Sequence, residues 1–555
     1  MPLREETGRV KRVGAGWNIL VDCDLGRMVR AALEARLGTE SAWPYGDGRA
    51  AERIVDLEGN SVSELNLEET RGKGLKILQI ARWYFSKKNS VTGVFERVFV
   101  KGHDFARNVS KIADSGLCMG CGTCESVCPV GAIRIRKDER RGIYLPVMDL
   151  NRCKQCELCL KVCPGASVNI MQLAEEFLDG RSKDKNIGKF EICYIGHASS
   201  MEIRYNSASG GLVTSLLIYA LEKHLIDGAL VLRMSETNPL ETEPFIATTP
   251  SEIIAASGSK YCPSAINAGL RHLFSKDGRF AVVGLPCHLH AIRKWETIDT
   301  KLREKIVLHL GLFCANNNTY LGTEYFLRQN RIHPENVREI RYRAEGWPGK
   351  IRVVLSDNTV RIIPRATTET KWYRKALFAS AFHYDFMIPR CLLCPDQTNE
   401  LADISFGDPW LSEYKQSERL GKSLVIVRNQ LAAKLVADAM RDGVILLEDI
   451  DPAVVKRAQN YSFKASVGAR IQLRRILRLP VPDYSDRDLS FTWRDLLKAL
   501  RYTPSYFSHH RWLWPAIRTF AIVHYIQMQA IGMVKAVIRF LLKRLGQRRA
   551  RGVTN

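Results

Sequence analysis

The sequence CMGCGTCESVCP, residues 118–129, decides how this part of the chain folds, and CKQCELCLKVCP, residues 153–164, repeats its spacing. In each run two residues separate the first cysteine from the second and the second from the third, and three residues separate the third from a fourth that directly precedes a proline. The short spacing lets three thiolates of one tight loop converge on one point, and the proline turns the chain away. The repeat predicts a compact unit of two similar halves over residues 111–172.

This spacing predicts two [4Fe–4S] clusters, because it is that of bacterial ferredoxins, in which the fourth cysteine ligates the cluster of the other half. We therefore assign one cluster to Cys118, Cys121, Cys124 and Cys163, and the second to Cys153, Cys156, Cys159 and Cys128. Cysteine pairs of this kind also suit tetrahedral zinc. Two four-cysteine runs that both end in Cys-Pro are a narrower pattern, which favours clusters in series and one-electron transfer.

The chain has 555 residues, which exceeds one compact core, so we expect several domains. Eight of its 15 cysteines fall in the two runs, a usage typical of a reducing compartment. The first residues, MPLREE, contain no apolar stretch of a secretory signal. We expect a cytoplasmic protein.

Composition divides the chain into five parts. The expected fold class is an α/β flavin domain preceded by a small α+β ferredoxin-like domain, with a helical C-terminal tail. The parts are an N-terminal segment of unknown role with one helix over Leu75–Phe85 (1–110), the two-cluster domain (111–172), a charged linker (173–189), the α/β domain (190–480) and a basic amphipathic tail (481–555).

The α/β assignment rests on alternating patterns between residues 190 and 480. Helical periodicity and short apolar runs follow one another, as expected for strands buried between helices. The predicted helices are 211–225 and 265–274, the predicted strands are 229–232, 280–285 and 306–313, and an antiparallel hairpin or small sheet is predicted over 340–364.

The C-terminal tail carries much of the net charge of +23, with twelve Lys or Arg between residues 491 and 555 against the single acid Asp495. Its longest uncharged stretch, 519–534, is shorter than the roughly 20 residues that span a bilayer. The pattern indicates a basic helix on an anionic membrane surface or a partner, or equally a helix packed on the protein's own body. Nucleic acid is the least favoured partner, because no base-reading module is recognisable.

Two further patterns each have two interpretations. The loop SASGGLVT, residues 207–214, opens a helix and suits an anion, although such a loop is often only a capped turn. Cys287, Cys314, Cys391 and Cys394 stand at loop positions and together could hold one more cluster, or else serve as apolar side chains and a lone pair.

Six runs in order resemble a known family: SGGLVT (209–214), DGALV (227–231), GSKY (258–261), LPC (285–287), GLFC (311–314), and CLLC with ELADIS (391–394 and 400–405). Together they look like the beta subunit of coenzyme F420 hydrogenase/dehydrogenase, over roughly residues 190–450. That family includes proteins with a fused ferredoxin unit and the plant-type 7-hydroxymethyl chlorophyll a reductase.

The resemblance implies FAD and a third [4Fe–4S] cluster. It places Cys287, Cys314, Cys391 and Cys394 around that cluster, and it places beside the flavin Ser209, Gly210, Gly211, Leu212, Val213, Thr214, Lys260 and Tyr261. His288 stands where the family often has Gln, and Cys262 follows the Lys-Tyr pair, so the substrate pocket need not be that of the family.

The implied function is that of an iron–sulfur flavoprotein oxidoreductase that couples one-electron transfer through the clusters to hydride chemistry at FAD. The expected substrate is coenzyme F420, a deazaflavin, or a ferredoxin-linked organic compound, and the expected partner is a redox protein or a deazaflavin or ferredoxin donor. The alternative is an electron-relay subunit of a membrane-associated or multisubunit complex, at the inner face of the membrane. Neither a catalytic residue nor the oligomeric state follows from the sequence.

Overall fold

The computed structural model of the chain describes residues 108–365, 370–459, 464, 466–484 and 486–529. By contacts the chain divides into two units, 1–87 and 88–555, and every described residue belongs to the second. The predicted helix over Leu75–Phe85, almost all of the N-terminal segment and the last part of the tail lie outside the described residues.

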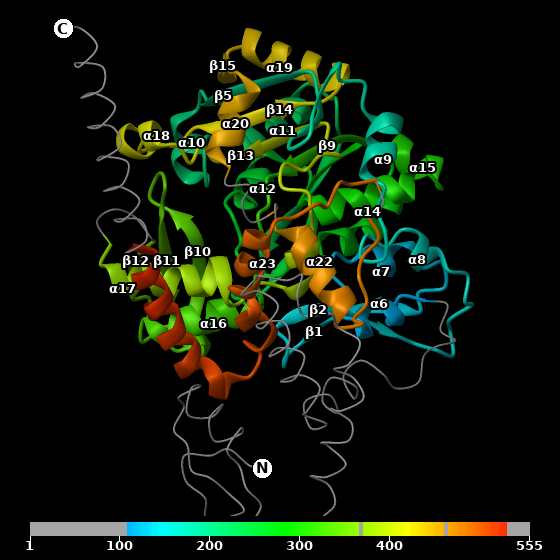
Figure 1. Cartoon of the computed structure of the whole chain (residues 1–555). Coiled ribbons are helices and arrows are strands. Elements are labelled where there is room, and N and C mark those ends of the chain that lie inside the picture. Colours follow the sequence, from blue (N-terminus) through cyan, green and yellow to red (C-terminus); the bar gives the residue numbers. More distant parts are fainter. Residues whose placement is uncertain (1–107, 366–369, 460–463, 465, 485, 530–555) are drawn as a thin grey trace, which may run out of the picture. The chain divides into compact units, whose positions relative to one another are not determined.

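A mixed eight-stranded sheet forms the centre of the second unit (Figure 1), in the order β15-β5-β14-β13-β9-β8-β6-β7. The four neighbours β13, β9, β8 and β6 run parallel, and the strands on both sides of them are antiparallel. The bounds are β5 Ile192–Ala198, β6 Gly228–Met234, β7 Thr242–Ala247, β8 Phe280–Gly284, β9 Ile306–Leu312, β13 Ile404–Gly407, β14 Ser423–Val427 and β15 Ile445–Asp449. The predicted α/β pattern is confirmed.

Helices cover both faces of this sheet, because its central strands are apolar on both sides. In β8, Ala281 packs into one core and its neighbours Phe280 and Val282 into another. The first core lies under α11 (Leu212–Glu222), α12 (Pro250–Ala255) and α19 (Gln430–Arg441). The second lies under η1 (Ile266–Gly269), α13 (Leu270–Phe274), α14 (Pro286–Glu296) and α15 (Thr300–Lys305). The helix predicted at 211–225 is present as α11, and the one predicted at 265–274 is a 3-10 helix, η1, followed by the short α-helix α13.

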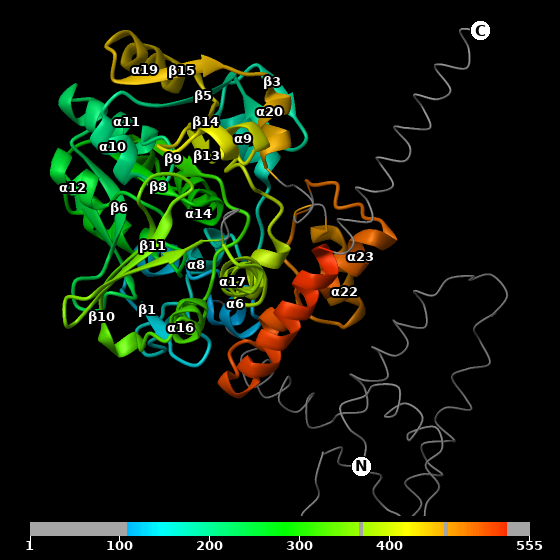
Figure 2. The ribbon, with the colours of Figure 1, turned by 90° about the vertical axis from the view of Figure 1, so that its left-hand side faces the viewer.

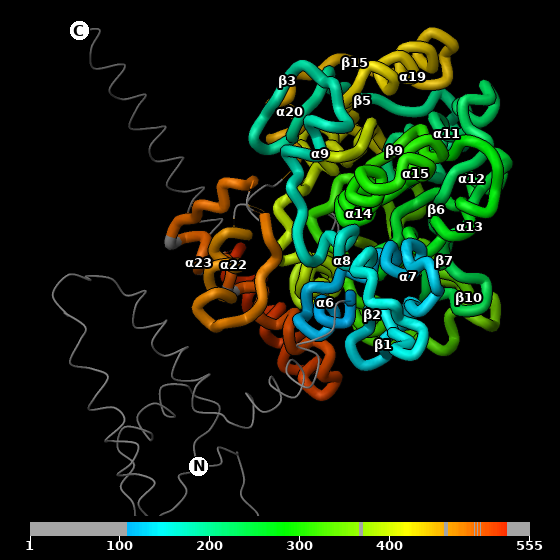
Figure 3. The backbone as a smooth tube through the Cα atoms, turned by 90° about the vertical axis from the view of Figure 1, so that its right-hand side faces the viewer, coloured from blue at the N-terminus to red at the C-terminus, as the bar shows by residue number. Residues whose placement is uncertain are grey.

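The cysteine-rich unit packs on this second helix layer, and Figure 3 shows α7 and α8 beside α14 and α13. It comprises α6 (Ser110–Asp114), α7 (Thr123–Val127), the antiparallel pair β1 (Ile133–Asp138) and β2 (Ile143–Met148), α8 (Leu158–Lys161) and α9 (Ile170–Phe177). Gly122 begins α7 with a φ of +93°, and a Cβ there would lie 2.5 Å from the backbone nitrogen of Ala268. Glycine therefore permits the close approach of the cysteine-rich unit to the helix layer that contains Ala268.

The charged segment 173–189, predicted as a linker, runs through the end of α9 and a short hairpin of β3 (Ser182–Asp184) and β4 (Gly188–Phe190). Lys189 donates a hydrogen bond of 2.8 Å to Glu175 across it.

A second sheet confirms the antiparallel element predicted over 340–364. It consists of β10 (Val337–Ala344), β11 (Lys350–Leu355) and β12 (Val360–Pro364). α16 (Tyr320–Gln329) and α17 (Trp372–Ala379) pack against it around an aromatic core.

The described part of the C-terminal region contains several helices joined by irregular segments. Figure 2 shows α22 (Val467–Ile476), α23 (Trp493–Leu500) and the helix over 514–529 grouped at one side, while α20 (Pro452–Ala458) follows β15. Within the described ranges, no helix combines the length and the apolar character needed to cross a membrane.

Candidate cofactor sites

The four thiols assigned to the first cluster lie together. Cys118, Cys121, Cys124 and Cys163 all line one small pocket. Burial, and after it the neighbouring thiols of Cys163 and Cys121, raise the pKa of Cys118 to about 12. Such thiols lose their protons only where a cation compensates the charge, which is what the iron of a cluster supplies. The N–H of Gly120 lies 3.4 Å from the sulfur of Cys118 and would stabilise the thiolate.

The second set lies nearer the surface. Burial raises the pKa of Cys159 to about 11, and the thiols of Cys156, Cys128 and Cys153 contribute to the rise, so these three thiols lie near Cys159. Cys153 is half-buried and Cys156 is exposed. Among the described residues, no three Cys, His, Asp or Glu side chains gather closely enough to hold a single metal ion.

The third set comes from three segments that lie far apart in the sequence. Cys287 lies in the first turn of α14, Cys314 follows β9, and Cys391 and Cys394 lie in and directly after η4 (Pro389–Leu393). Burial raises the pKa of Cys287 well above its usual value, and the thiols of Cys314, Cys391 and Cys394 add to the shift. A donor set of four neighbouring thiols, one buried and three half-buried, fits a [4Fe–4S] cluster.

The first and third sets are neighbours. The thiol of Cys121 contributes to the raised pKa of Cys287. From the far end of α14, Lys294 donates hydrogen bonds to the carbonyl oxygens of Cys163 (3.0 Å) and Ser167 (2.7 Å). Arg390, next to Cys391, donates to the carbonyl of Pro164 (3.2 Å).

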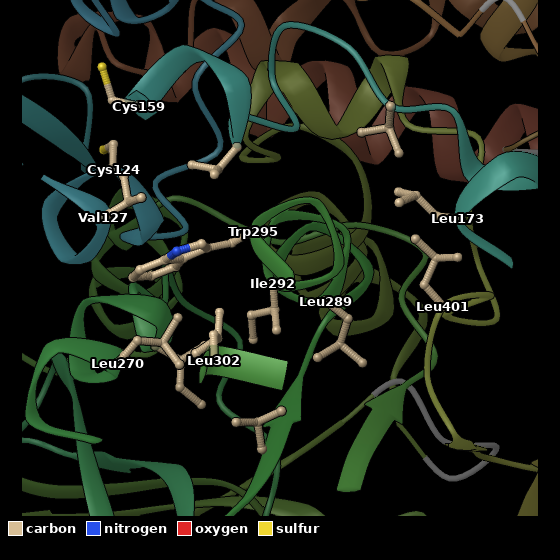
Figure 4. Packing of buried hydrophobic residues seen from close by; sticks show 14 of the residues in the cluster. Cys124, Val127, Cys159, Leu173, Leu270, Leu289, Ile292, Trp295, Leu302 and Leu401 are labelled. Carbon is tan, nitrogen blue, oxygen red and sulfur yellow. The ribbon is translucent and has the colours of Figure 1, made fainter. Parts of the chain in front are cut away.

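Apolar packing fixes α14 against the cysteine-rich unit. Figure 4 shows Trp295, Ile292 and Leu289 projecting from α14, with Cys124 and Val127 on the side of the cysteine-rich unit. A buried charge network holds the same helix to the sheet: Arg293 donates to Glu296 (2.9 Å) and Asp403 (2.7 Å), and His309 lies between the same two carboxylates (2.8 and 3.0 Å). Cys287, the member of the third set that α14 carries, is therefore held on a helix fixed to both the cysteine-rich unit and the sheet.

The predicted flavin loop is anchored from below. The hydroxyl of Ser209 donates to the carbonyl of Lys422 (2.6 Å), and the N–H of Gly210 donates to the hydroxyl of Ser423 (2.9 Å). A Cβ on Gly210 would lie 2.6 Å from the carbonyl oxygen of Gly196, so glycine lets the loop rest on two strands. Leu212 and Thr214 are buried in α11, which has no side-chain cap.

Lys260 and Tyr261 lie near a group of buried arginines. The ammonium of Lys260 donates to the carbonyl oxygens of Ala256 and Ser257, and burial lowers its pKa to about 8. The hydroxyl of Tyr261 accepts a hydrogen bond of 3.2 Å from Arg365. Arg341, on β10, contributes to the lowered pKa of Lys260 and donates to the carbonyl of Asn206, next to the loop (3.2 Å).

The arginine group itself was not predicted from the sequence. Arg343 forms two hydrogen bonds with Asp408 (2.8 and 3.1 Å), and the indole of Trp347 donates to the same carboxylate (2.7 Å). Within the described part of the chain, the Nε atoms of Arg343 and Arg365 and the hydroxyl of Ser207 are buried without a hydrogen-bond partner. These unsatisfied donors fit an anionic cofactor. An arginine in a strand gives no sequence signal of burial, so only contacts reveal it.

Two histidines near Cys287 serve local structure. His288 accepts a hydrogen bond from the N–H of Leu285 (3.0 Å), and burial lowers its pKa to about 4. His290 pairs with Asp396 at 2.8 Å, both buried.

Comparison with protein families matches three parts of the chain. Residues 193–271 match the N-terminal part of the beta subunit of coenzyme F420 hydrogenase/dehydrogenase, and residues 277–453 match the C-terminal part of the same beta subunit. Residues 117–166 match a 4Fe-4S dicluster domain. The matched ranges contain all three cysteine sets and the flavin loop.

Three relatives illustrate the range of the similarity. A component of the F(420)H(2) dehydrogenase of Methanosarcina mazei is 28% identical over 62% of this chain and 88% of its own. The beta component of the coenzyme F420 hydrogenase of Methanosarcina barkeri is 25% identical over 48% of this chain and 85% of its own. Coenzyme F420-dependent sulfite reductase of Methanocaldococcus jannaschii is 26% identical over 61% of this chain and 49% of its own.

Proposed function

The chain belongs to the family of coenzyme F420 hydrogenase/dehydrogenase beta subunits and is an oxidoreductase with a 4Fe–4S dicluster domain, and from this we propose that it couples one-electron transfer to hydride chemistry at FAD. We assign three [4Fe–4S] clusters to the three cysteine sets. Two-electron chemistry on an organic substrate then meets one-electron chemistry of the clusters within one chain.

The observation that carries this proposal is the order of the cysteine sets. The second set contains the exposed Cys156, whereas every cysteine of the first and third sets is buried or half-buried, and the third set adjoins the first through Cys287 and Cys121. The thiol of Cys159 also contributes to the raised pKa of Cys124, and both residues line one pocket, which links the first two sets. A continuous series from surface to interior suits electron transfer and has no use in a purely structural site.

FAD would be held by the chain's unsatisfied and positively charged groups. The N-terminus of α11 after Gly211, the buried hydroxyl of Ser207 and Lys260 would bind the diphosphate. Arg365 and Tyr261 would orient the ring system. When bound, FAD supplies the conversion between hydride and single electrons.

The proposed substrate is coenzyme F420, or else an organic compound whose reaction is coupled to ferredoxin. The relatives are named for reactions of coenzyme F420 with different second substrates, so one scaffold serves several reactions. His288 and Cys262, the two residues at which this chain differs from the family pattern, directly follow Cys287 and Tyr261 in the sequence.

The test is anaerobic turnover with a panel of deazaflavin, nicotinamide and ferredoxin donors, measured beside iron and flavin content. We expect about twelve iron atoms and one FAD per chain and turnover with the deazaflavin. A colourless protein without iron or acid-labile sulfide contradicts the whole proposal. A brown protein without flavin leaves the clusters and removes the hydride chemistry.

One observation favours a second role, as a relay at a membrane or in a larger complex. The C-terminal helix over 514–529 exposes Phe520, Val523, Ile526 and Met528, and Trp512 precedes it with 76% of its surface exposed. A helix with exposed apolar residues, in a tail whose sequence is basic, suits peripheral contact at an anionic, inner membrane face. Activity that appears only in a reconstituted complex would support the relay over the stand-alone enzyme.

A further inference from the structure

A broad open pocket of about 910 Å³ lies beside the second cysteine set. Its lining includes Cys128 with Pro129 and Gly131, which belong to the loop of that set. The lining also includes four basic residues, Arg134, Arg152, Lys154 and Arg271. No acidic residue of the described chain lines the pocket. The pocket is therefore a positively charged concavity at the exposed end of the series of cysteine sets.

Most of this charge is not neutralised by ion pairs within the described part of the chain. Among the described residues, neither Arg152, Lys154 nor Arg271 forms an ion pair. Arg134 approaches Glu125 at 3.5 Å, but its side chain is 46% exposed, and such pairs are weak.

Hydrogen bonds to backbone oxygens hold two of the guanidinium groups in place. Arg271 donates to the carbonyl of Cys128 (3.2 Å), and Arg152 donates to that of Val130 (2.8 Å). Both groups lie within 3.6 Å of the position that a Cβ on Gly131 would take, so they converge on one point of the pocket.

Apolar side chains accompany the charges. Phe274 and Trp295 line the pocket. Val147, 55% exposed, stands opposite Arg134 on the neighbouring strand and so shares its face of the pair, and Leu150 is 59% exposed. Mixed aromatic, apolar and arginine surface is typical of a protein interface rather than of a site for a small anion.

We propose that this surface, formed by Arg134, Arg152, Lys154, Arg271, Val147 and Leu150, docks a small acidic protein that carries one electron. The inference deepens the proposed function, on which it rests, by naming the partner and its entry point. Complementary charge would steer the carrier to the exposed cysteine set. Each encounter oxidises a reduced carrier by one electron, and two electrons with one proton from water make one hydride equivalent for the organic substrate, which is reduced.

The first test measures binding without turnover. The probe is an oxidised acidic bacterial ferredoxin, and its dissociation constant for the loaded full chain is measured by calorimetry between about 20 and 200 mM salt. We expect binding that weakens steeply with salt, and a loss of about tenfold in the double variant Arg134→Glu/Lys154→Glu at low salt. Binding that ignores salt, or that the reversal leaves unchanged, overturns the proposal.

The matched control reverses two exposed charges on α19, Lys434→Glu/Arg441→Glu, which lies at the far end of the large sheet from α7 and α8 (Figures 1 and 3). We expect no change there, and an equal loss contradicts a local surface. Because Lys154 adjoins Cys153, iron content is measured in every variant. Arg134→Glu alone changes no residue next to a cysteine of the sets, and it should still weaken ferredoxin binding, by less than the double variant.

Two further measurements separate the alternatives. Reduced methyl viologen should reduce wild type and variants equally, since it needs no docking surface. A chain that binds ferredoxin but accepts no electron from viologen contradicts the proposed function while supporting the docking surface. Duplex DNA provides the last comparison. If the wild type binds DNA but not ferredoxin, and the double variant loses DNA binding, the surface belongs to nucleic acid and the proposal is overturned.

Discussion

At the scale of single residues, several thiols of the cysteine sets have a pKa that burial and neighbouring thiols raise. Cys118, Cys287 and Cys314 are each shifted upward first by burial and then by neighbouring thiols. Bound iron reverses this cost, because its positive charge makes thiolate the favoured form. Cys193, buried on β5, belongs to no set. Burial is the main cause that raises its pKa, to about 11, and no other thiol is among the causes.

Substituting Cys391 by Ser should remove about one third of the iron, roughly four atoms of twelve, and leave the ferredoxin-type clusters intact. Iron analysis and electron paramagnetic resonance of the reduced protein check this. Cys193→Ser is the matched control and should keep all its iron. Unchanged iron in Cys391→Ser contradicts the third cluster.

Lys260 should make flavin binding depend on pH. Its pKa of about 8, lowered by burial, means that the ammonium loses its charge as the pH rises through this value. An anionic diphosphate is bound best by the charged form, so we expect FAD affinity to fall above about pH 8. Fluorescence titration of flavin-free protein measures it.

In Lys260→Met this slope should disappear, and affinity at pH 7 should fall about tenfold, the value of one charged hydrogen bond. Lys434→Met, on the exposed face of α19, should keep the wild-type curve. A slope that survives in Lys260→Met places the titrating group elsewhere.

At the scale of elements, the flavin loop is held by a second loop that passes beneath it. Gly421 has a φ of +111°, and a Cβ there would lie 2.4 Å from the carbonyl oxygen of Ser209. Arg204 donates to the carbonyl of Gly421 (2.8 Å), and the N–H of Trp347 donates to that of Arg419 (2.6 Å). The loop at 418–422 thus joins the start of α11 to the arginine group on β10.

Gly421→Ala should therefore lower the free energy of unfolding by several kcal/mol and weaken FAD binding, because backbone must move. Gly443→Ala is the matched control: its φ is +71°, but a Cβ there would have open space within 4 Å. It should cost about 1 kcal/mol, the backbone strain alone. Urea unfolding measures both, and equal costs would show that the contact with Ser209 does not matter.

At the scale of the whole molecule, the described unit has a basic redox end and a separate C-terminal helix with exposed apolar residues. We expect the helix over 514–529 to direct the chain to anionic vesicles, since its exposed apolar residues accompany a basic tail. Val523→Ser/Ile526→Ser should weaken cosedimentation with such vesicles at least about tenfold. The control is Leu431→Ser/Leu446→Ser, two exposed apolar residues elsewhere, which should have no effect. Absence of vesicle binding by the wild type would leave the helix to a protein partner.

Much of the architecture could be predicted from local pattern. The strands at 280–285 and 306–313 and the helix at 211–225 were predictable because their apolar residues recur with the period of the element. The segment 173–189 was harder, because its charges suggest a linker, whereas pairing of Ser182–Asp184 with Gly188–Phe190 forms a hairpin. A three-residue strand carries too little pattern to be recognised.

The sequence by itself determined the cysteine runs and the family, because ligand spacing within a tight loop is a property of adjacent residues. Only the tertiary structure decided that Cys287 adjoins Cys121, that Arg343 and Arg365 are buried near Tyr261, and that Arg271 reaches the loop of Cys128. Each of these joins residues far apart in the chain. Their meeting depends on the order of strands and the packing of α14, which no local period encodes.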